Sequence, residues 1–216
     1  MRTLLLFLLV SSASTALHAQ KKSYTIVFLN TKATAEKLDE QAAQKLMDGH
    51  MANIRKLFEE GKLLVAGPFD GGGGIFIFNT TSSDEAEHWL QTDPAVQANR
   101  WNIEILPYIP RKGSICPVTG PVQMVSYTFV RFTAVVQKYT AATYPIIIRQ
   151  HEAFMNQIVT ASDIVTEAIF GANEGGILIL KGELPSDAFS DDPGVQQQLL
   201  DVQVKKLYVA KTSFCE

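Results

Sequence analysis

The stretch GGIFIF at residues 73–78 decides the fold, because it returns as GGILIL at residues 175–180. Both copies place glycines directly before four apolar residues, a pattern typical of a buried strand that follows a tight turn. Further pairs keep a spacing of about 100 residues, which is the size of a domain and too long for a solenoid repeat. They are SYT at residues 23–25 and 126–128, and DPAVQ and DPGVQ at residues 93–97 and 192–196. The sequence therefore contains an internal repeat of domain size.

The two copies carry the same order of predicted elements. Periodicity and turn residues predict strands at residues 24–30, 62–66, 75–78 and 101–106 of the first copy, with helices at residues 35–60 and 81–90. The second copy has predicted strands at residues 127–136, 164–169, 177–180 and 203–210, a helix at residues 144–160, and a shortened second helix.

This order, β-α-β-β-α-β, is that of the ferredoxin-like fold. Such a sheet has helices on one face and leaves its other face bare, so two copies can bury their bare faces against each other. We therefore expect an α+β protein of the dimeric α/β-barrel type, in which two ferredoxin-like domains pack as an intramolecular pseudo-dimer. Further oligomerisation is left open.

The chain divides into four parts in this interpretation. Residues 1–19 combine Arg2, an apolar run and a small polar segment, which together are typical of a secretory signal peptide cleaved after Ala19. Residues 20–108 and 123–216 are the two domains, and the Pro- and Gly-rich residues 109–122 link them. We expect an exported protein, periplasmic or secreted, with no membrane contact after signal cleavage.

The charge of the chain argues against a nucleic-acid partner, and its cysteine content bears on whether it forms a disulfide. Lys and Arg number 19 against 22 Asp and Glu, and they form no basic cluster, so nucleic acid is not an expected partner. Cys116 and Cys215 each follow the end of one copy. In an exported chain this even number favours a disulfide, and two free thiols are the alternative.

His50 is the leading candidate for chemistry. It lies four residues after Leu46 and four before Ile54, on the apolar side of the first long helix. An imidazole there suits acid–base catalysis, and a core histidine bonded to a backbone carbonyl is the alternative. His151 stands at the matching place in the second copy, which strengthens the functional interpretation.

Other candidates surround the glycine run. Gly67 and Pro68 end a strand before Gly71–Gly74, where bare backbone N–H groups can approach a ligand closely, and a flexible hairpin turn is the alternative that the sequence favours. Asp70 is the nearest acid that could orient an imidazole or a ligand. Arg100 could meet an anionic ligand at the start of a strand, and a surface position is its alternative.

The remaining motifs point to structure. Asp93 and Asp192, each followed by proline, are predicted to cap the turn after the second helix. No metal-ligand spacing, nucleophile elbow or phosphate-binding motif is present, so neither a metal site nor an organic cofactor is expected.

The first copy resembles the YCII-related (YciI-like) domain. The resemblance rests on YTIVF at residues 24–28, His50, the GKLLVAGP stretch at residues 61–68 and Asp93-Pro94. It implies a ferredoxin-like fold similar to muconolactone isomerase that dimerises through its sheets around an active-site cleft. The histidine implied as the site residue falls on His50, and Glu59 stands where many members carry an aspartate. Residues 126–210 resemble a diverged second copy, which keeps His151 and lacks the Gly-Pro pair.

Two classes of function follow. A few members of the family act on chlorinated hydroxymuconates or related ring-cleavage products, which implies acid–base isomerase or lyase chemistry at His50. In that hypothesis a small organic molecule, an anion among the alternatives, binds in an inter-domain cleft. The competing hypothesis is a non-catalytic ligand-binding protein or a structural dimer module.

Overall fold

The structure is a computed structural model that describes residues 22–118, 120–161, 163–171, 175–185 and 187–215. The predicted signal peptide at residues 1–19 lies outside these residues. Among the helices that are described, none is long and apolar enough to cross a lipid bilayer.

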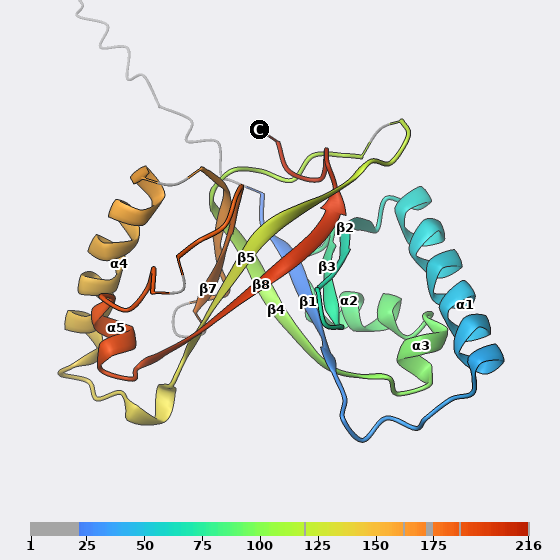
Figure 1. The fold of residues 1–216 in the computed structure, drawn as a ribbon, viewed down its shortest axis with the longest axis horizontal. Coiled ribbons are helices and arrows are strands. Elements are labelled where there is room, and N and C mark those ends of the chain that lie inside the picture. Colours follow the sequence, from blue (N-terminus) through green and yellow to red (C-terminus); the bar gives the residue numbers. More distant parts are fainter. Residues whose placement is uncertain (1–21, 119, 162, 172–174, 186, 216) are drawn as a thin grey trace, which may run out of the picture.

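The first half has the predicted order of elements (Figure 1). Its elements are β1 (Tyr24–Thr31), α1 (Glu40–Glu59), β2 (Leu63–Pro68), β3 (Gly74–Phe78), α2 (Ser83–Leu90), the short helix α3 (Pro94–Gln97) and β4 (Trp101–Lys112).

The second half repeats this order with one difference. Its elements are β5 (Met124–Ala134), a 3₁₀ turn (Val136–Lys138), α4 (Tyr144–Ala161), β6 (Ile164–Ile169), β7 (Gly176–Leu180), α5 (Pro193–Gln196) and β8 (Leu200–Ala210). The described residues between β7 and α5 form turns, where the first half has α2 and where a shortened helix was predicted.

Local capping sets where the first long helix begins. The carboxylate of Asp39 accepts a hydrogen bond from the backbone N–H of Ala42, so α1 starts at Glu40 and not at the predicted residue 35. The helix ends where predicted, because Gly61 follows it with a positive φ of 66°.

All eight strands belong to one antiparallel sheet in the order β2-β3-β1-β4-β6-β7-β5-β8. The halves join where the last part of β4 pairs with β6, with Ile109 opposite Ile169 and Lys112 opposite Glu167. Residues 109–112 therefore continue a strand, although the sequence assigned them to the linker. Their Pro110 disturbs the ladder only locally, where the register shifts.

The two outer strands of the sheet also meet, which closes it into a barrel. Phe69, just after β2, forms an isolated antiparallel bridge with Leu207 of β8, and the N–H of Asp70 donates to the carbonyl of Lys206 at 2.9 Å. Gly67 makes this approach possible, because a Cβ at this position would lie only 2.5 Å from the carbonyl oxygen of Tyr208. The predicted dimeric α/β-barrel architecture is confirmed.

Side chains from both halves fill the barrel interior. Phe28 of the first half contacts Phe129 and Phe170 of the second at ring-centroid distances of 6.2 and 5.7 Å. The interior cluster includes Ile26, Val65, Ile77, Val165, Ile177 and Leu207, all nearly inaccessible to solvent. The helices lie outside, with α1, α2 and α3 over one half and α4 and α5 over the other (Figure 1). Separate apolar clusters fill the space between helices and sheet in each half.

An ion pair between the halves lies beside Phe28 of this interior. The guanidinium of Arg131, on β5, donates two hydrogen bonds to the carboxylate of Glu104, on β4, at 3.1 and 2.7 Å. The same group lies 4.0 Å from the ring centroid of Phe28. These hydrogen bonds lower the pKa of Glu104 below its usual value. The pair thus fixes one half against the other by charge as well as by packing.

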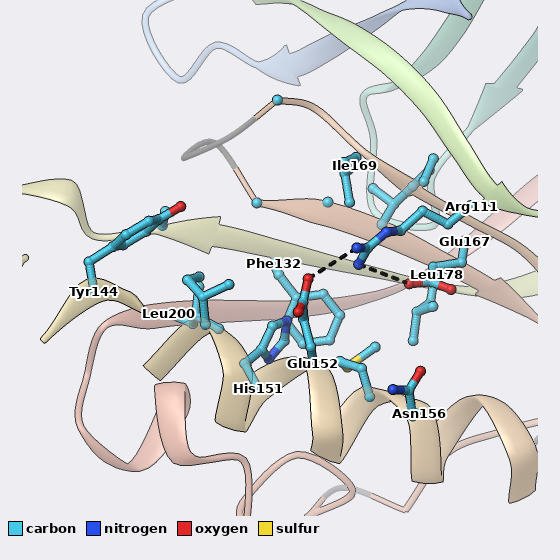
Figure 2. Close-up of a pocket in the computed structure, with 18 of the residues that line it drawn as sticks. Arg111, Phe132, Tyr144, His151, Glu152, Asn156, Glu167, Ile169, Leu178 and Leu200 are labelled. Atoms are coloured by element: carbon cyan, nitrogen blue, oxygen red, sulfur yellow. Dashed lines mark hydrogen bonds and ion pairs between the residues drawn. The ribbon is translucent and has the colours of Figure 1, made fainter. Parts of the chain in front are cut away.

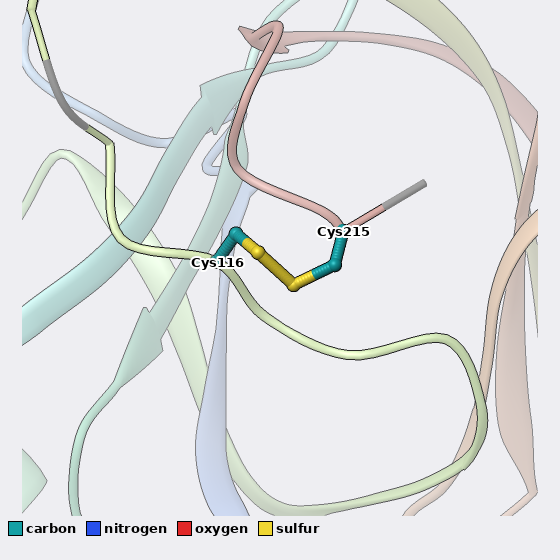
Figure 3. Close-up of a disulfide and its surroundings, with 2 residues drawn as sticks. All are labelled: Cys116 and Cys215. Atoms are coloured by element: carbon teal, nitrogen blue, oxygen red, sulfur yellow. A yellow bond between two sulfur atoms is a disulfide. The ribbon is translucent and has the colours of Figure 1, made fainter.

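A disulfide joins the connection between the halves to the C-terminal segment (Figure 3). Cys116 and Cys215 are bonded, and their backbone N–H groups donate to the carbonyls of Ser213 and Ser114, each on the opposite segment. Ile115 and Phe214 pair between these segments and belong to the interior cluster. The bridge therefore holds the connection between the halves against the C-terminal segment, over apolar side chains that belong to the core.

We expect the disulfide to contribute strongly to stability, because it closes a loop with a sequence separation of 99. Replacing both cysteines with serine should lower the free energy of unfolding by about 2–5 kcal/mol. Urea unfolding of the wild type and the double variant, each with and without dithiothreitol, measures this. The reductant should bring the wild type to the stability of the variant and leave the variant unchanged. Equal midpoints for the oxidised wild type and the variant would contradict the bridge.

Candidate functional site

Each half holds a histidine–aspartate pair between its long helix and the outer face of the sheet. Nδ1 of His50, on α1, lies 2.7 Å from Oδ2 of Asp93. Nδ1 of His151, on α4, lies 2.6 Å from Oδ2 of Asp192. Both aspartates are fully buried. The two pairs have the same atoms and nearly the same distance, so the repeat seen in the sequence extends to a repeated polar site.

One carboxylate does two things in each pair. Oδ1 of Asp93 caps α3 by accepting from the N–H of Ala95 at 2.8 Å, and Oδ1 of Asp192 caps α5 by accepting from the N–H of Gly194 at 2.7 Å. The predicted capping role is therefore confirmed. The second oxygen of each aspartate is left to accept from the histidine.

This geometry fixes the state of the imidazole. A buried carboxylate accepts, so the neutral histidine carries its proton on Nδ1 and keeps a lone pair on Nε2. A histidine oriented in this way can act as a general base through Nε2, and the aspartate stabilises the imidazolium that forms.

The first pair is enclosed. His50 is 8% exposed and lies beside the rings of Phe76 and Trp101, at centroid distances of 5.9 and 5.1 Å. Gly49 allows α1 to approach α3 closely, because a Cβ there would lie 3.1 Å from the ring of Pro94. Asn53 extends the network, since its amide lies 3.5 Å from Asp93. These contacts describe a well-packed polar cluster.

The histidine of the second pair, His151, lines a cavity of about 480 Å³, a volume typical of sites for small organic molecules (Figure 2). The cavity lies between α4 and the sheet of the second half. Its apolar wall includes Phe132, Ile148, Met155, Ile177, Leu178 and Leu200, and two tyrosines, Tyr139 and Tyr144, add aromatic surface.

A charged cluster occupies one end of the cavity. Arg111, on the last part of β4, forms ion pairs with Glu152 of α4 at 3.0 Å and with Glu167 of β6 at 3.9 Å. Figure 2 shows Arg111 and Glu167 at the end opposite Tyr144, with His151 and Glu152 between the two ends. The cavity thus combines an apolar body, a charged end and a base, which is what a site for proton transfer on an organic molecule requires.

The segment from β1 into β4 matches a known domain family over residues 24–109. The matching family model is that of the YCII-related domain. The match ends before β5, so the descent of the second half from the same family remains a prediction, supported by its repeated elements and its second pair.

Solved structures share the fold over most of the chain. A mutant chlorite dismutase from Candidatus Nitrospira defluvii in complex with cyanide is 7% identical, with a TM-score of 0.50, and the match covers 87% of this chain and 91% of that one. A candidate monooxygenase from Fusobacterium nucleatum subsp. nucleatum has 9% identity and a TM-score of 0.48 over 88% of this chain and 92% of its own. A candidate chlorite dismutase has 12% identity and a TM-score of 0.46 over 90% and 95%. Such likeness concerns the fold alone. Among curated proteins, none matches the chain.

The structure does not bring the predicted site residues together. His50 of the YCII-related domain and His151 lie on α1 and α4, on opposite sides of the barrel (Figure 1). The sheet faces that pack between the halves bury apolar side chains, so neither histidine lies in an inter-domain cleft of the kind predicted. The sheet faces that the two halves share are filled by apolar side chains, so both histidine–aspartate pairs lie on the outer face of the sheet, under the helices.

Gly67, Pro68 and Asp70 lie at the seam of the barrel. Gly67 and Pro68 pair with Ile75 and Gly74, and the backbone of Asp70 bonds to β8. The close approach of β8 explains why residue 67 is glycine. Pro68 and Asp70 are explained by their pairing at the seam and by the turn that follows β2. This segment therefore has a structural explanation that the sequence did not suggest.

Arg100 and Glu59, which the sequence offered as site residues, are not the groups that pair with the histidines. The guanidinium of Arg100 donates to the carbonyl of Glu36 and so holds the loop before α1. Glu59 is an exposed residue at the end of α1, and the acid that His50 contacts is Asp93.

Sequence reasoning missed the acids and the arginine of the cavity. The signal for the acids was present, because each Asp-Pro pair recurs at nearly the same distance from its histidine, 43 and 41 residues. Arg111 gave no such signal, since it lay within the predicted linker. Among the described residues, no group of three or more His, Cys, Asp or Glu side chains is placed to hold a metal ion.

Replacing Asp192 with asparagine should reverse the tautomer of His151. The amide oxygen can still cap α5, which turns the NH₂ group toward Nδ1 and moves the imidazole proton to Nε2. The ¹⁵N shifts of the imidazole above pH 8 report the tautomer. Asp93→Asn is the matched control and should change His50 alone. An unchanged His151 spectrum in Asp192→Asn would contradict the assigned hydrogen bond.

Proposed function

We propose that this protein binds a small organic molecule in the cavity beside His151 and that His151 transfers a proton to or from it. The observation that carries the proposal is the combination of a buried carboxylate on Nδ1 with a cavity lined by the same imidazole. In this proposal Nε2 takes a proton from a C–H or O–H group of the ligand, and Asp192 stabilises the imidazolium. The reaction class is isomerisation or elimination, both of which need proton transfer at carbon.

The cavity supports His151, and not His50, as the acting residue. Both histidines are largely buried, with side-chain exposures of 16% for His151 and 11% for His50. The rings of Phe76 and Trp101 lie beside the His50 imidazole, whereas His151 has the ring of Phe132 beside it and lines a space large enough for a ligand. In the same proposal the pair in the YCII-related domain serves to join α1 to α3.

Proton transfer can be tested with a neutral ketone. Phenylacetone carries acidic protons next to its carbonyl, and its deuterium uptake in D₂O is read by NMR. The wild type should accelerate uptake above the buffer rate. His151→Gln should reduce the acceleration by about 10²–10⁴-fold, because general-base catalysis contributes on that order.

The matched control is His50→Gln, which should retain the wild-type rate. Binding of phenylacetone is followed separately through the shifts of the His151 ring signals. Saturable shifts without acceleration would support the non-catalytic binding protein instead. A rate lost in His50→Gln and retained in His151→Gln would overturn the assignment.

We also propose that the chain is exported. Residues 1–19 have the composition of a signal peptide, and a disulfide persists in oxidising compartments. Intact mass spectrometry of the full chain produced in a bacterial host should find the protein in the periplasm or medium with Gln20 as its first residue and with the bridge formed. Recovery of the uncleaved chain only in the cytoplasm would contradict export.

A further inference from the structure

We infer that the ligand of the His151 cavity is an organic cation, with an apolar or aromatic body and an ammonium group. This inference rests on the proposed function of the cavity and names its ligand class. It differs from the anion considered from the sequence.

The charges of the cavity favour a cation. Among its described lining residues, Arg111 is the only side chain that is always positive, and Glu152 and Glu167 are both negative at neutral pH. Protonation of His151 does not reverse this sign, because Asp192 lies against it and adds a third carboxylate. Counting Arg111, Glu152, Glu167 and Asp192 together, the described groups carry a net charge of −2 when His151 is neutral and −1 when it is protonated.

The arginine is already engaged by carboxylates. Its Nη2 lies 3.0 Å from Glu152 and its Nη1 lies 3.9 Å from Glu167. A ligand carboxylate would have to displace one of these partners and would meet the other at close range. A ligand ammonium group needs to displace neither glutamate, since both carboxylates can accept further hydrogen bonds from it.

Partial burial of the two glutamates strengthens the preference for a cation over an anion. The side chain of Glu167 is 19% exposed and that of Glu152 is 44% exposed, so part of the cluster is shielded from water and salt. A cation that enters therefore gains more from these carboxylates than it would from carboxylates on an open surface.

The rest of the cavity fits an apolar or aromatic body. Phe132 and Leu200 line it near His151, and Tyr144 lies at the end away from Arg111 (Figure 2). Aromatic faces also attract cations, which adds to the preference set by the glutamates. A ligand with its ring toward Tyr144 and its ammonium toward Glu167 would place its middle carbons beside His151.

Three probes of similar shape separate charge from shape. They are 3-phenylpropylamine, 3-phenylpropan-1-ol and 4-phenylbutanoate, which are a cation, a neutral molecule and an anion at pH 7. Dissociation constants for the full chain come from equilibrium dialysis, with ligand-observed NMR as a second readout. The amine should bind at least about tenfold more tightly than the carboxylate.

Variants then assign the preference to the cluster. Glu167→Gln and Glu152→Gln should each weaken amine binding about five- to tenfold and leave alcohol binding within twofold. Glu183→Gln removes an exposed glutamate outside the cavity lining and is the matched control, with no effect expected. Thermal unfolding of each variant confirms that it is folded.

The outcomes are distinct. Tight amine binding that is lost in the two cavity variants supports the inference. Carboxylate binding equal to or tighter than amine binding overturns it, while alcohol binding in the same assay shows that the cavity still takes a ligand. If none of the three probes binds, the proposed function of the cavity fails together with the ligand class.

Discussion

Mutual burial of the two half-sheets is the constraint on which the rest of the structure depends. Each half presents apolar side chains on the sheet face that its own helices do not cover, and a face of that size is unstable in water. Closing eight strands into one barrel buries both faces in a single cluster, and the Phe69–Leu207 bridge joins the two outer strands. Gly67 at the seam, the Arg131–Glu104 ion pair and the disulfide all serve this closure.

The same constraint decides where chemistry can occur. Because the interior is filled by side chains, polar sites are left to the layer between helices and sheet. There the short helices α3 and α5 supply N-terminal N–H groups that need an acceptor, and aspartate supplies it. The second carboxylate oxygen is then buried without a partner unless a donor reaches it, and the histidine of the long helix does so. The capping requirement and the histidine site are therefore one arrangement, formed twice.

The sequence predicted the fold well and the site only in part. Repeated strands and turns identified two ferredoxin-like halves, because period-2 and helical patterns are local signals. The histidines were found by their repeat, and the aspartates were recognised as caps. Their pairing was missed because contact between residues about 40 positions apart depends on how α1 and α3 pack, which no local pattern encodes. The cavity beside His151 depends on residues from six elements, one of which is the strand that continues past residue 108, and no local pattern in the sequence shows how they come together.

That continuing strand has a consequence for the history of the molecule. Arg111 is encoded with the first half and lines the cavity of the second, where it meets Glu152 and Glu167. A second half that had arisen or survived alone would lack this charge and would face three carboxylates with one imidazole. The covalent link thus does more than hold two halves at high local concentration. It lets the first half supply a residue to the cavity of the second, so a substitution in one half can change the charge of the cavity in the other.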